Sequence, residues 1–258
     1  MSVAENFRAV LAHIEEARKR RAVRDEKIIL VAVTKNHGVE LMREAIDAGA
    51  TDIGENRVQE AAQKFPALDR QVTRHLIGHL QTNKVKQAVK LFDVIQSVDS
   101  IHLATALDKA AAQLEKIQDV LIQVNAAREP QKSGVLIEDL NELTEFVDDA
   151  KNLHLRGLMM IAPNFPDVED CRPLFRQMRS LFDEMKTSRR DFDLLSMGMT
   201  HDYKIAVEEG ANVVRIGTAI FGERIYQRCA ANAPCFSYGD ESAQIFPCIS
   251  GIICPERG

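Results

Sequence analysis

The sequence has no tryptophan and three tyrosines, and no apolar run approaches the roughly 20 residues that a membrane-spanning helix requires. Its first 21 residues, MSVAENFRAVLAHIEEARKRR, contain acidic residues and apolar residues at helical spacing. A signal peptide would show an uninterrupted apolar stretch there instead. These absences argue against a membrane span and a secretory leader, so we expect a cytoplasmic protein.

The chain also has no excess of positive charge. Lysine and arginine total 33 against 38 aspartate and glutamate residues, which gives a formal net charge of −5. This balance provides no electrostatic basis for binding nucleic acid or an anionic membrane. The basic cluster Arg18–Arg21 is expected at the solvated end of a first helix, where cations are favoured by the helix dipole.

Cysteine is scarce and unevenly placed. Cys171 lies in the body of the chain, and the other four are near the end: Cys229, Cys235, Cys248 and Cys254. A disulfide-stapled fold would spread its cysteines through the core-forming segments, and zinc ligands usually come in closer pairs. We expect no metal site, and we interpret residues 229–258 as an irregular, loop-rich C-terminal tail.

The rest of the chain alternates strand-like apolar runs with amphipathic segments. The eight apolar runs are Ile28–Thr34, Asp52–Gly54, His75–Ile77, Val94–Val98, Val120–Val124, Leu155–Met160, Leu194–Met197 and Val213–Ile216. Such alternation favours parallel pairing through right-handed crossovers. Eight units in a chain of this length predict an α/β protein, a single (β/α)8 TIM barrel over residues 1–228 with an extra N-terminal helix.

Five of the intervening segments have clear helical spacing. They are Val39–Ala48, Ser100–Lys116, Ile137–Ala150, Val168–Lys186 and Asp202–Glu209. Ser100 is the expected N-cap of the second. An open, doubly wound sheet is the alternative fold, but it would need a glycine-rich turn after the first strand, and TKNHGVE is not one.

The first strand ends on a lysine. Most lysines at strand ends extend into water while their stems pack, so the position alone carries little information. In a barrel, however, the residues that follow the strands collect at one face. Lys35 is therefore expected to share a face with the polar residues that follow the other strands.

The loops after the seventh and eighth strands are SMGMTHD and RIGTAIFG. Barrels often bind phosphate with these two loops, using backbone N–H groups, hydroxyls and a helix N-terminus. Either segment alone is typical of a turn and a helix cap. Together they indicate a phosphate site built from Ser196, Gly198, Thr200, Gly217 and Thr218.

A lysine facing a phosphate site suits Schiff-base chemistry, because desolvation and neighbouring cations make an amine nucleophilic. Two ligands fit: a phosphorylated sugar, as in an aldolase, or pyridoxal 5′-phosphate. An aldolase needs an acid–base group nearby, and Glu55 is the obvious carboxylate. We expect His75 to be a packed strand residue and His79 to be a hydrogen-bond donor in a loop. They are four residues apart, but the strand and Gly78 between them do not give the helical spacing of a metal-binding pair.

Five segments in order resemble the pyridoxal phosphate homeostasis protein family: VAVTKNHG, IGENRVQEA, HLIGHLQTNKVK, VNAAREPQKSGV and LSMGMTHDYKIAVEEGANVVRIGTAIFG. The resemblance covers about residues 5–225. It implies a barrel like the N-terminal domain of bacterial alanine racemase, with pyridoxal 5′-phosphate on Lys35 and Arg215 facing the pyridine nitrogen. It also implies the remaining cofactor contacts: phosphate held by Thr200, Gly217 and Thr218 with Ser196 nearby, and a cofactor lined by Asn56 and Met197.

Two residues depart from the family pattern: Thr34 and Thr200 stand where serine is commoner. Both keep the hydroxyl group. The tail has no counterpart in the family.

An arginine cannot give a proton to the pyridine nitrogen, which leaves the cofactor ring a weaker electron sink. Alanine racemase combines that arrangement with a second base, a tyrosine from a C-terminal domain, and no tyrosine here lies in such a motif.

We therefore expect a carrier and not an enzyme. The resemblance implies a monomer that holds pyridoxal 5′-phosphate reversibly as a lysine Schiff base, takes part in vitamin B6 homeostasis and meets apoenzymes transiently. A racemase of low activity and a Schiff-base aldolase are the alternatives.

Overall fold

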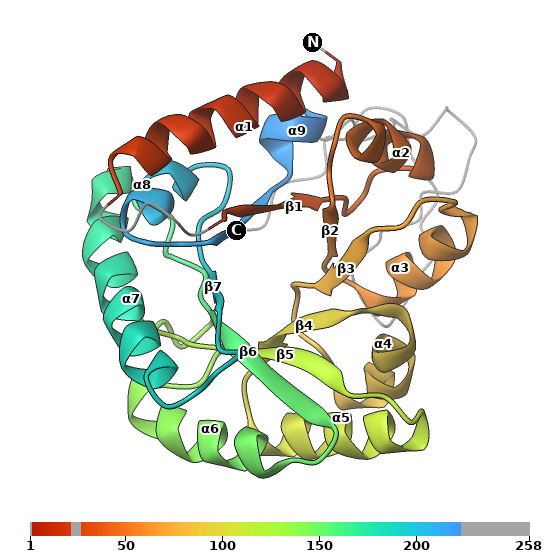
Figure 1. The fold of residues 1–258 in the computed structure, drawn as a ribbon, viewed down its shortest axis with the longest axis vertical. Helices are drawn as coiled ribbons and strands as arrows, with labels where there is room; N and C mark the ends of the chain where they lie inside the picture. Colours follow the sequence, from red (N-terminus) through yellow and green to blue (C-terminus); the bar gives the residue numbers. More distant parts are fainter. Residues whose placement is uncertain (1, 22–26, 223–258) are drawn as a thin grey trace, which may run out of the picture. The chain divides into compact units, whose positions relative to one another are not determined.

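The computed structural model describes residues 2–21 and 27–222, in which eight parallel strands close into a barrel in the order β1 to β8 (Figure 1). The strands are β1 (Ile29–Val33), β2 (Asp52–Glu55), β3 (Thr73–Leu76), β4 (Val94–Val98), β5 (Gln118–Gln123), β6 (Leu153–Met159), β7 (Leu194–Ser196) and β8 (Val213–Ile216). The predicted TIM barrel is confirmed. The predicted tail, residues 229–258, lies outside the described residues.

Helices follow the strands and form a ring around the barrel (Figure 1). They are α1 (Val3–Lys19), α2 (Val39–Asp47), α3 (Val58–Lys64), α4 (Val85–Leu91), α5 (Ile101–Gln113), α6 (Leu140–Asp149), α7 (Arg172–Lys186), α8 (Tyr203–Glu208) and α9 (Thr218–Phe221). Helix α1 precedes the first strand, which confirms the extra N-terminal helix. None of the helices in the described part of the chain is long and apolar enough to cross a membrane.

Two hydrophobic layers hold the barrel. Side chains alternate between the two faces of each strand, so every second residue points inward. The inner layer is small and consists of Val31, Val94, Leu121, Met159, Leu194 and Val213. The outer layer lies between strands and helices and contains most of the buried apolar side chains.

Helix α1 packs against α2, α8 and α9. Ser2 begins it with a capping box, in which its hydroxyl accepts the Glu5 N–H and the Glu5 carboxylate accepts the Ser2 N–H. The Asn6 amide donates to the Ile220 carbonyl at 3.0 Å, which joins the helix to α9. Arg21 corrects the expectation of a solvated basic cluster, because it is buried and its Nη2 donates to a backbone carbonyl.

Three helices were not predicted from the sequence, namely α3, α4 and α9. They have seven, seven and four residues, which is too short for a clear apolar period. Two of the predicted helices instead begin with a separate 3₁₀ turn, at Ile137–Asp139 and Val168–Cys171. Pro173, in the first turn of α7, suits a fresh helix start. The predicted cap is confirmed, since the Ser100 hydroxyl accepts the Leu103 N–H at 3.3 Å.

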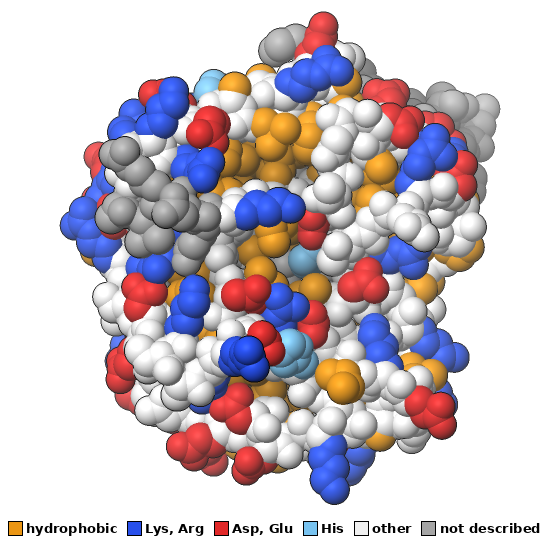
Figure 2. Space-filling model, in the orientation of Figure 1, with side chains coloured by type: hydrophobic (Ala, Val, Ile, Leu, Met, Phe, Trp, Pro, Cys, Tyr) orange, Lys and Arg blue, Asp and Glu red, His pale blue; other side chains and the backbone are white. Residues whose placement is uncertain are grey.

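Charges of both signs are mixed on the face in Figure 2, where acidic and basic side chains lie beside one another without a large area of one sign. This distribution agrees with the small net charge of −5. A nucleic-acid-binding surface would show a continuous basic area instead.

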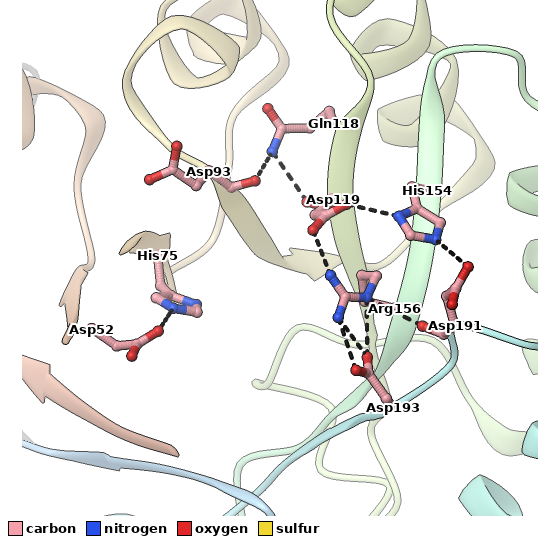
Figure 3. Close-up of polar contacts among 9 residues, drawn as sticks. All are labelled: Asp52, His75, Asp93, Gln118, Asp119, His154, Arg156, Asp191 and Asp193. Atoms are coloured by element: carbon pink, nitrogen blue, oxygen red, sulfur yellow. Dashed lines mark hydrogen bonds and ion pairs between the residues drawn. The ribbon is translucent and has the colours of Figure 1, made fainter. Parts of the chain in front are cut away.

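A group of charged residues links β5, β6 and the segment before β7 (Figure 3). The Arg156 guanidinium donates to both oxygens of Asp193, at 2.8 and 2.9 Å, and to Asp119 Oδ2 at 2.8 Å. The other Asp119 oxygen lies 2.9 Å from His154 Nδ1. One partly buried arginine therefore ties three consecutive strands together.

We predict that Arg156→Leu lowers the free energy of unfolding by about 1–3 kcal/mol, because two aspartates lose hydrogen bonds from a charged donor. Arg176→Leu is the matched control, since that side chain is 66% exposed and pairs with Glu209. It should cost less than about 1 kcal/mol. Urea unfolding of both variants decides the matter, and equal losses would contradict a structural role for Arg156.

Candidate functional site

Lys35 stands at the carboxyl end of the barrel, just beyond β1. Within β1, Ile29 and Val31 pack inside the barrel, and Leu30 and Ala32 face the helices. Lys35 lies in the turn that follows Thr34 and is half-buried. The end of β1 therefore fixes the lysine at the carboxyl end of the barrel.

The turn that carries Lys35 is held by three residues of β2 and α3, which we call the Lys64 cluster: Glu55, Glu60 and Lys64. The Lys64 ammonium donates to the Thr34 carbonyl at 2.9 Å. A carboxylate oxygen of Glu60 accepts the Asn36 N–H at 2.5 Å. Asn36 has a φ of 63°, a left-handed conformation that asparagine tolerates better than most residues. The backbone is thus fixed on both sides of Lys35.

Glu55 is the fully buried member of the cluster. Its Oε1 accepts hydrogen bonds from the Thr34 hydroxyl at 2.6 Å and from Lys64 Nζ at 2.9 Å. Burial raises the pKa of Glu55 above its usual range, although the Lys64 ammonium and the Thr34 hydroxyl oppose the shift. One oxygen of the carboxyl group therefore supports the turn that carries Lys35.

Asn56 follows β2 at the same end of the barrel and is half-buried. Gly78, after β3, approaches it so closely that an added Cβ would lie 2.3 Å from the Asn56 carbonyl oxygen. Only glycine fits at that position. The contact fixes the backbone of Asn56 next to the turn that carries Lys35.

Thr200 and Thr218 follow β7 and β8 at the same end. Gly198 shapes the first of these loops, with a φ of 95° and room for no Cβ, which would lie 2.6 Å from Ala206 Cβ. Helix α9 begins at Thr218 with Gly217 as its N-cap and no side-chain cap. Neither threonine hydroxyl hydrogen-bonds to another described residue, so both hydroxyls and the first N–H groups of α9 can serve a ligand.

Arg215 is a buried cation in the barrel interior. Its Nη1 donates to Ser196 Oγ at 2.6 Å and its Nη2 to the Met160 carbonyl at 2.8 Å. Burial lowers the pKa of Arg215 to about 10, against the attraction of Asp202, so the side chain stays charged at neutral pH. Strand β8 lies beside β1, and their register puts Arg215 deeper in the barrel than Lys35.

The structure does not bring the Met197 side chain to this site. Met197 follows the inward-facing Ser196, so strand alternation turns it outward. It is fully buried in the layer between strands and helices. The predicted lining of the cofactor by Met197 stays a prediction, and this burial leaves the Met197 backbone as the group that would provide it.

On the other side of the barrel end, His79 is a largely exposed loop residue. Its Nδ1 lies 3.3 Å from Ser133 Oγ and 3.6 Å from Asp99 Oδ2. These residues follow β3, β5 and β4, so they complete the ring of polar groups around the carboxyl ends of the strands. His75 faces the interior instead, as a packed strand residue.

Comparison with known proteins places the chain in a family. The model of the alanine racemase N-terminal domain matches residues 5–225. A protein of Aquifex aeolicus (strain VF5) named pyridoxal phosphate homeostasis protein is 42% identical over 231 residues, which cover 88% of this chain and all of that protein. The chain belongs to the pyridoxal phosphate homeostasis protein family.

Solved structures extend the likeness to three dimensions. PipY of Synechococcus elongatus PCC7942 with pyridoxal phosphate bound has a TM-score of 0.75 and 36% identity, covering 86% of this chain and 100% of PipY. PipY without the cofactor has a TM-score of 0.76 and 37% identity over the same shares. The homeostasis family fold therefore extends over nearly all of the described residues.

Sequence reasoning missed Glu60, Lys64 and Gln96, of which Gln96 contacts Ser196. Glu60 and Lys64 are four residues apart, a spacing that predicts contact on a helix, but α3 itself was not predicted. Gln96 lies within an apolar strand, and nothing in its spacing marks it. Such contacts become visible only when strands distant in sequence meet across the barrel.

We predict that Lys64→Met lowers the free energy of unfolding by about 3 kcal/mol at about pH 8, because it leaves the Glu55 carboxylate buried without its cation. Burial already raises the Glu55 pKa above the ordinary 4.5, so the folded protein binds this proton more tightly than the unfolded chain. Stability from this group therefore falls as the pH rises, and more steeply without Lys64.

The penalty of Lys64→Met should accordingly shrink at about pH 5, where Glu55 can protonate. Lys19→Met is the control, since Lys19 forms an exposed pair with Glu16. Chemical unfolding of both variants at the two pH values gives the comparison. A penalty for Lys64→Met that does not change with pH would contradict this account of the cluster.

Proposed function

We propose that this chain binds pyridoxal 5′-phosphate reversibly through Lys35 and serves as a carrier in the homeostasis of that cofactor. One observation carries the proposal: Lys35, half-buried in the turn after β1, lies at the same end of the barrel as the uncapped start of α9. Homologous proteins are named for pyridoxal phosphate homeostasis, and PipY has been solved with the cofactor bound.

The residues present fit the chemical groups of the cofactor. An amine at Lys35 matches the aldehyde, with which it forms a Schiff base by loss of water. The hydroxyls of Thr200 and Thr218 and the first N–H groups of α9 offer donors for a phosphate. Arg215, deeper in the interior, offers N–H groups to the pyridine nitrogen.

The remaining predicted contacts belong to the same proposal. Gly217 would bring its backbone close to the phosphate, and Asn56 would lie beside the ring. Ser196 is buried and its hydroxyl engages Arg215, so its contribution is to the arginine. Met197 would contribute only through its backbone.

The arginine favours a carrier over an enzyme. Bound pyridoxal phosphate supplies an electron-withdrawing ring, whose strength depends on a protonated nitrogen. Arg215 keeps its own proton at neutral pH and has none to give. It holds the nitrogen as a hydrogen-bond acceptor, which leaves the ring a weak electron sink.

The acid–base groups in the described residues also favour a carrier. Racemisation needs a proton removed from one face and delivered to the other. Tyr203 is buried and its hydroxyl lies 3.2 Å from His13 Nδ1, next to α1. Glu55 is fully buried and accepts a hydrogen bond from Lys64. Neither supplies a second base opposite Lys35, so a racemase or an aldolase is the weaker hypothesis.

The proposal extends to the setting of the carrier. A monomer in the cytoplasm that releases its cofactor would meet pyridoxal-phosphate-dependent apoenzymes transiently. Reversible Schiff-base formation supports such a role, because transfer to another lysine exchanges one imine for another without an added reactant.

We predict that Lys35→Ala abolishes the visible absorbance of protein-bound pyridoxal phosphate and the fixation of cofactor by borohydride, while circular dichroism stays unchanged. The reason is that the strand-end amine alone meets the aldehyde. Lys84→Ala, on the loop after β3, is the control and should retain both signals. Equal fixation in Lys35→Ala, mapped by mass spectrometry to another lysine, would overturn the assignment.

Replacing Thr200 and Thr218 together with valine should speed the release of pyridoxal phosphate while leaving the Schiff base able to form at high cofactor concentration. Each hydrogen bond to a charged phosphate is worth about 1.5–3 kcal/mol, so the loss of two should raise the dissociation constant at least about a hundredfold. Equilibrium dialysis measures it. An unchanged constant would place the phosphate elsewhere.

A further inference from the structure

A line of hydrogen bonds crosses the barrel interior from β8 to β2. Arg215 Nη1 lies 2.6 Å from Ser196 Oγ, which lies 2.7 Å from Gln96 Oε1. Gln96 Nε2 lies 2.9 Å from His75 Nδ1, and His75 Nε2 lies 2.9 Å from Asp52 Oδ1. Figure 3 shows the last pair, with Asp52 on β2 and His75 on β3. We call Asp52, His75, Gln96 and Ser196 the relay.

The chemistry of these groups fixes the direction of every donor. An amide nitrogen only donates, so His75 Nδ1 accepts from Gln96 and the ring proton is on Nε2, facing Asp52. The Gln96 carbonyl only accepts, so the Ser196 hydroxyl donates its single proton to that hydrogen bond. The Ser196 oxygen then presents its lone pairs to Arg215. All four donors point from the arginine toward the carboxylate.

The relay joins two opposite charges through neutral groups. Each of its members is at most 8% exposed. Burial opposes the charge of Asp52, but hydrogen bonds from His75 and the Thr51 hydroxyl hold the pKa of Asp52 below its usual range. Arg215 is a cation without a carboxylate among its hydrogen-bond acceptors in the described residues. Asp202 attracts its charge, whereas the relay fixes the direction in which Ser196 presents its lone pairs to it.

We propose that the relay positions the Arg215 guanidinium for the pyridine nitrogen of pyridoxal phosphate, so that residues that never touch the cofactor set its affinity. This inference rests on the proposed function. If Gln96 loses its amide, the Ser196 proton loses its acceptor, and the hydroxyl no longer presents its lone pairs to Arg215 in one fixed direction. The hydrogen bond from Arg215 to Ser196 is then weakened, while the one to the Met160 carbonyl remains.

The test uses the full-length protein and two ligands: pyridoxal phosphate and its 1-deaza analogue, which has C–H in place of the ring nitrogen. Gln96→Met preserves side-chain length but removes the relay. Gln118→Met is the matched control, because Gln118 is also fully buried on the next strand and donates to the Asp93 and Asp119 carbonyls instead.

Gln96→Met should weaken pyridoxal phosphate about tenfold, the scale of one hydrogen bond to a charged group, and change the affinity for the analogue by less than about twofold. Gln118→Met should change neither the affinity for pyridoxal phosphate nor that for the analogue. Adding Ser196→Ala to Gln96→Met should cost little more, since both act through one arginine.

Equal weakening of both ligands by Gln96→Met would show a merely structural role and overturn the inference. Unchanged binding of both would also overturn it. If the unmodified protein binds neither ligand, the proposed function itself fails, and the two failures are thereby distinguished. Urea unfolding of each variant without ligand confirms that the comparison concerns folded protein.

Discussion

The burial of Arg215 is the constraint on which the rest of the interior depends. A guanidinium inside a barrel requires acceptors for its N–H groups and a negative charge within reach. Here the acceptors are a serine hydroxyl and a backbone carbonyl, and Asp202 attracts the charge. A second carboxylate, Asp52, lies across the barrel at the end of the hydrogen-bonded relay. Apolar packing is correspondingly limited to a small inner layer, and the larger core lies between strands and helices.

The turn that carries Lys35 is held in a different way. Lys64 and Glu60 hydrogen-bond to its backbone, and buried Glu55 pairs with the Lys64 ammonium. In the proposed function, this turn fixes where the Lys35 amine would meet the aldehyde, and the barrel interior fixes Arg215 for the pyridine nitrogen. A carrier needs both positions to be held before the ligand arrives, because ordering them on binding would weaken retention.

The fold and the position of Lys35 just beyond the first strand could be predicted from sequence because they depend on periodicity. Apolar runs such as Val94–Val98 and the turn after Val33 mark strands and their ends without reference to distant residues. The burial of the Met197 side chain between strands and helices could not be read from its motif, because a motif names neighbours whose side chains alternate between the two faces of a strand. Gln96 and His75 could not be assigned, since their partners come from other strands and only barrel closure brings them together.

The central claim is that Arg215 holds an unprotonated pyridine nitrogen, which makes this protein a holder of pyridoxal phosphate rather than a catalyst. The most direct measurement is the ¹⁵N NMR chemical shift of ring-labelled pyridoxal phosphate bound to the protein at neutral pH. The account predicts the shift of a neutral pyridine that accepts a hydrogen bond, and a loss of that hydrogen-bond shift in Arg215→Met. The shift of a pyridinium ion in the unmodified protein would contradict it.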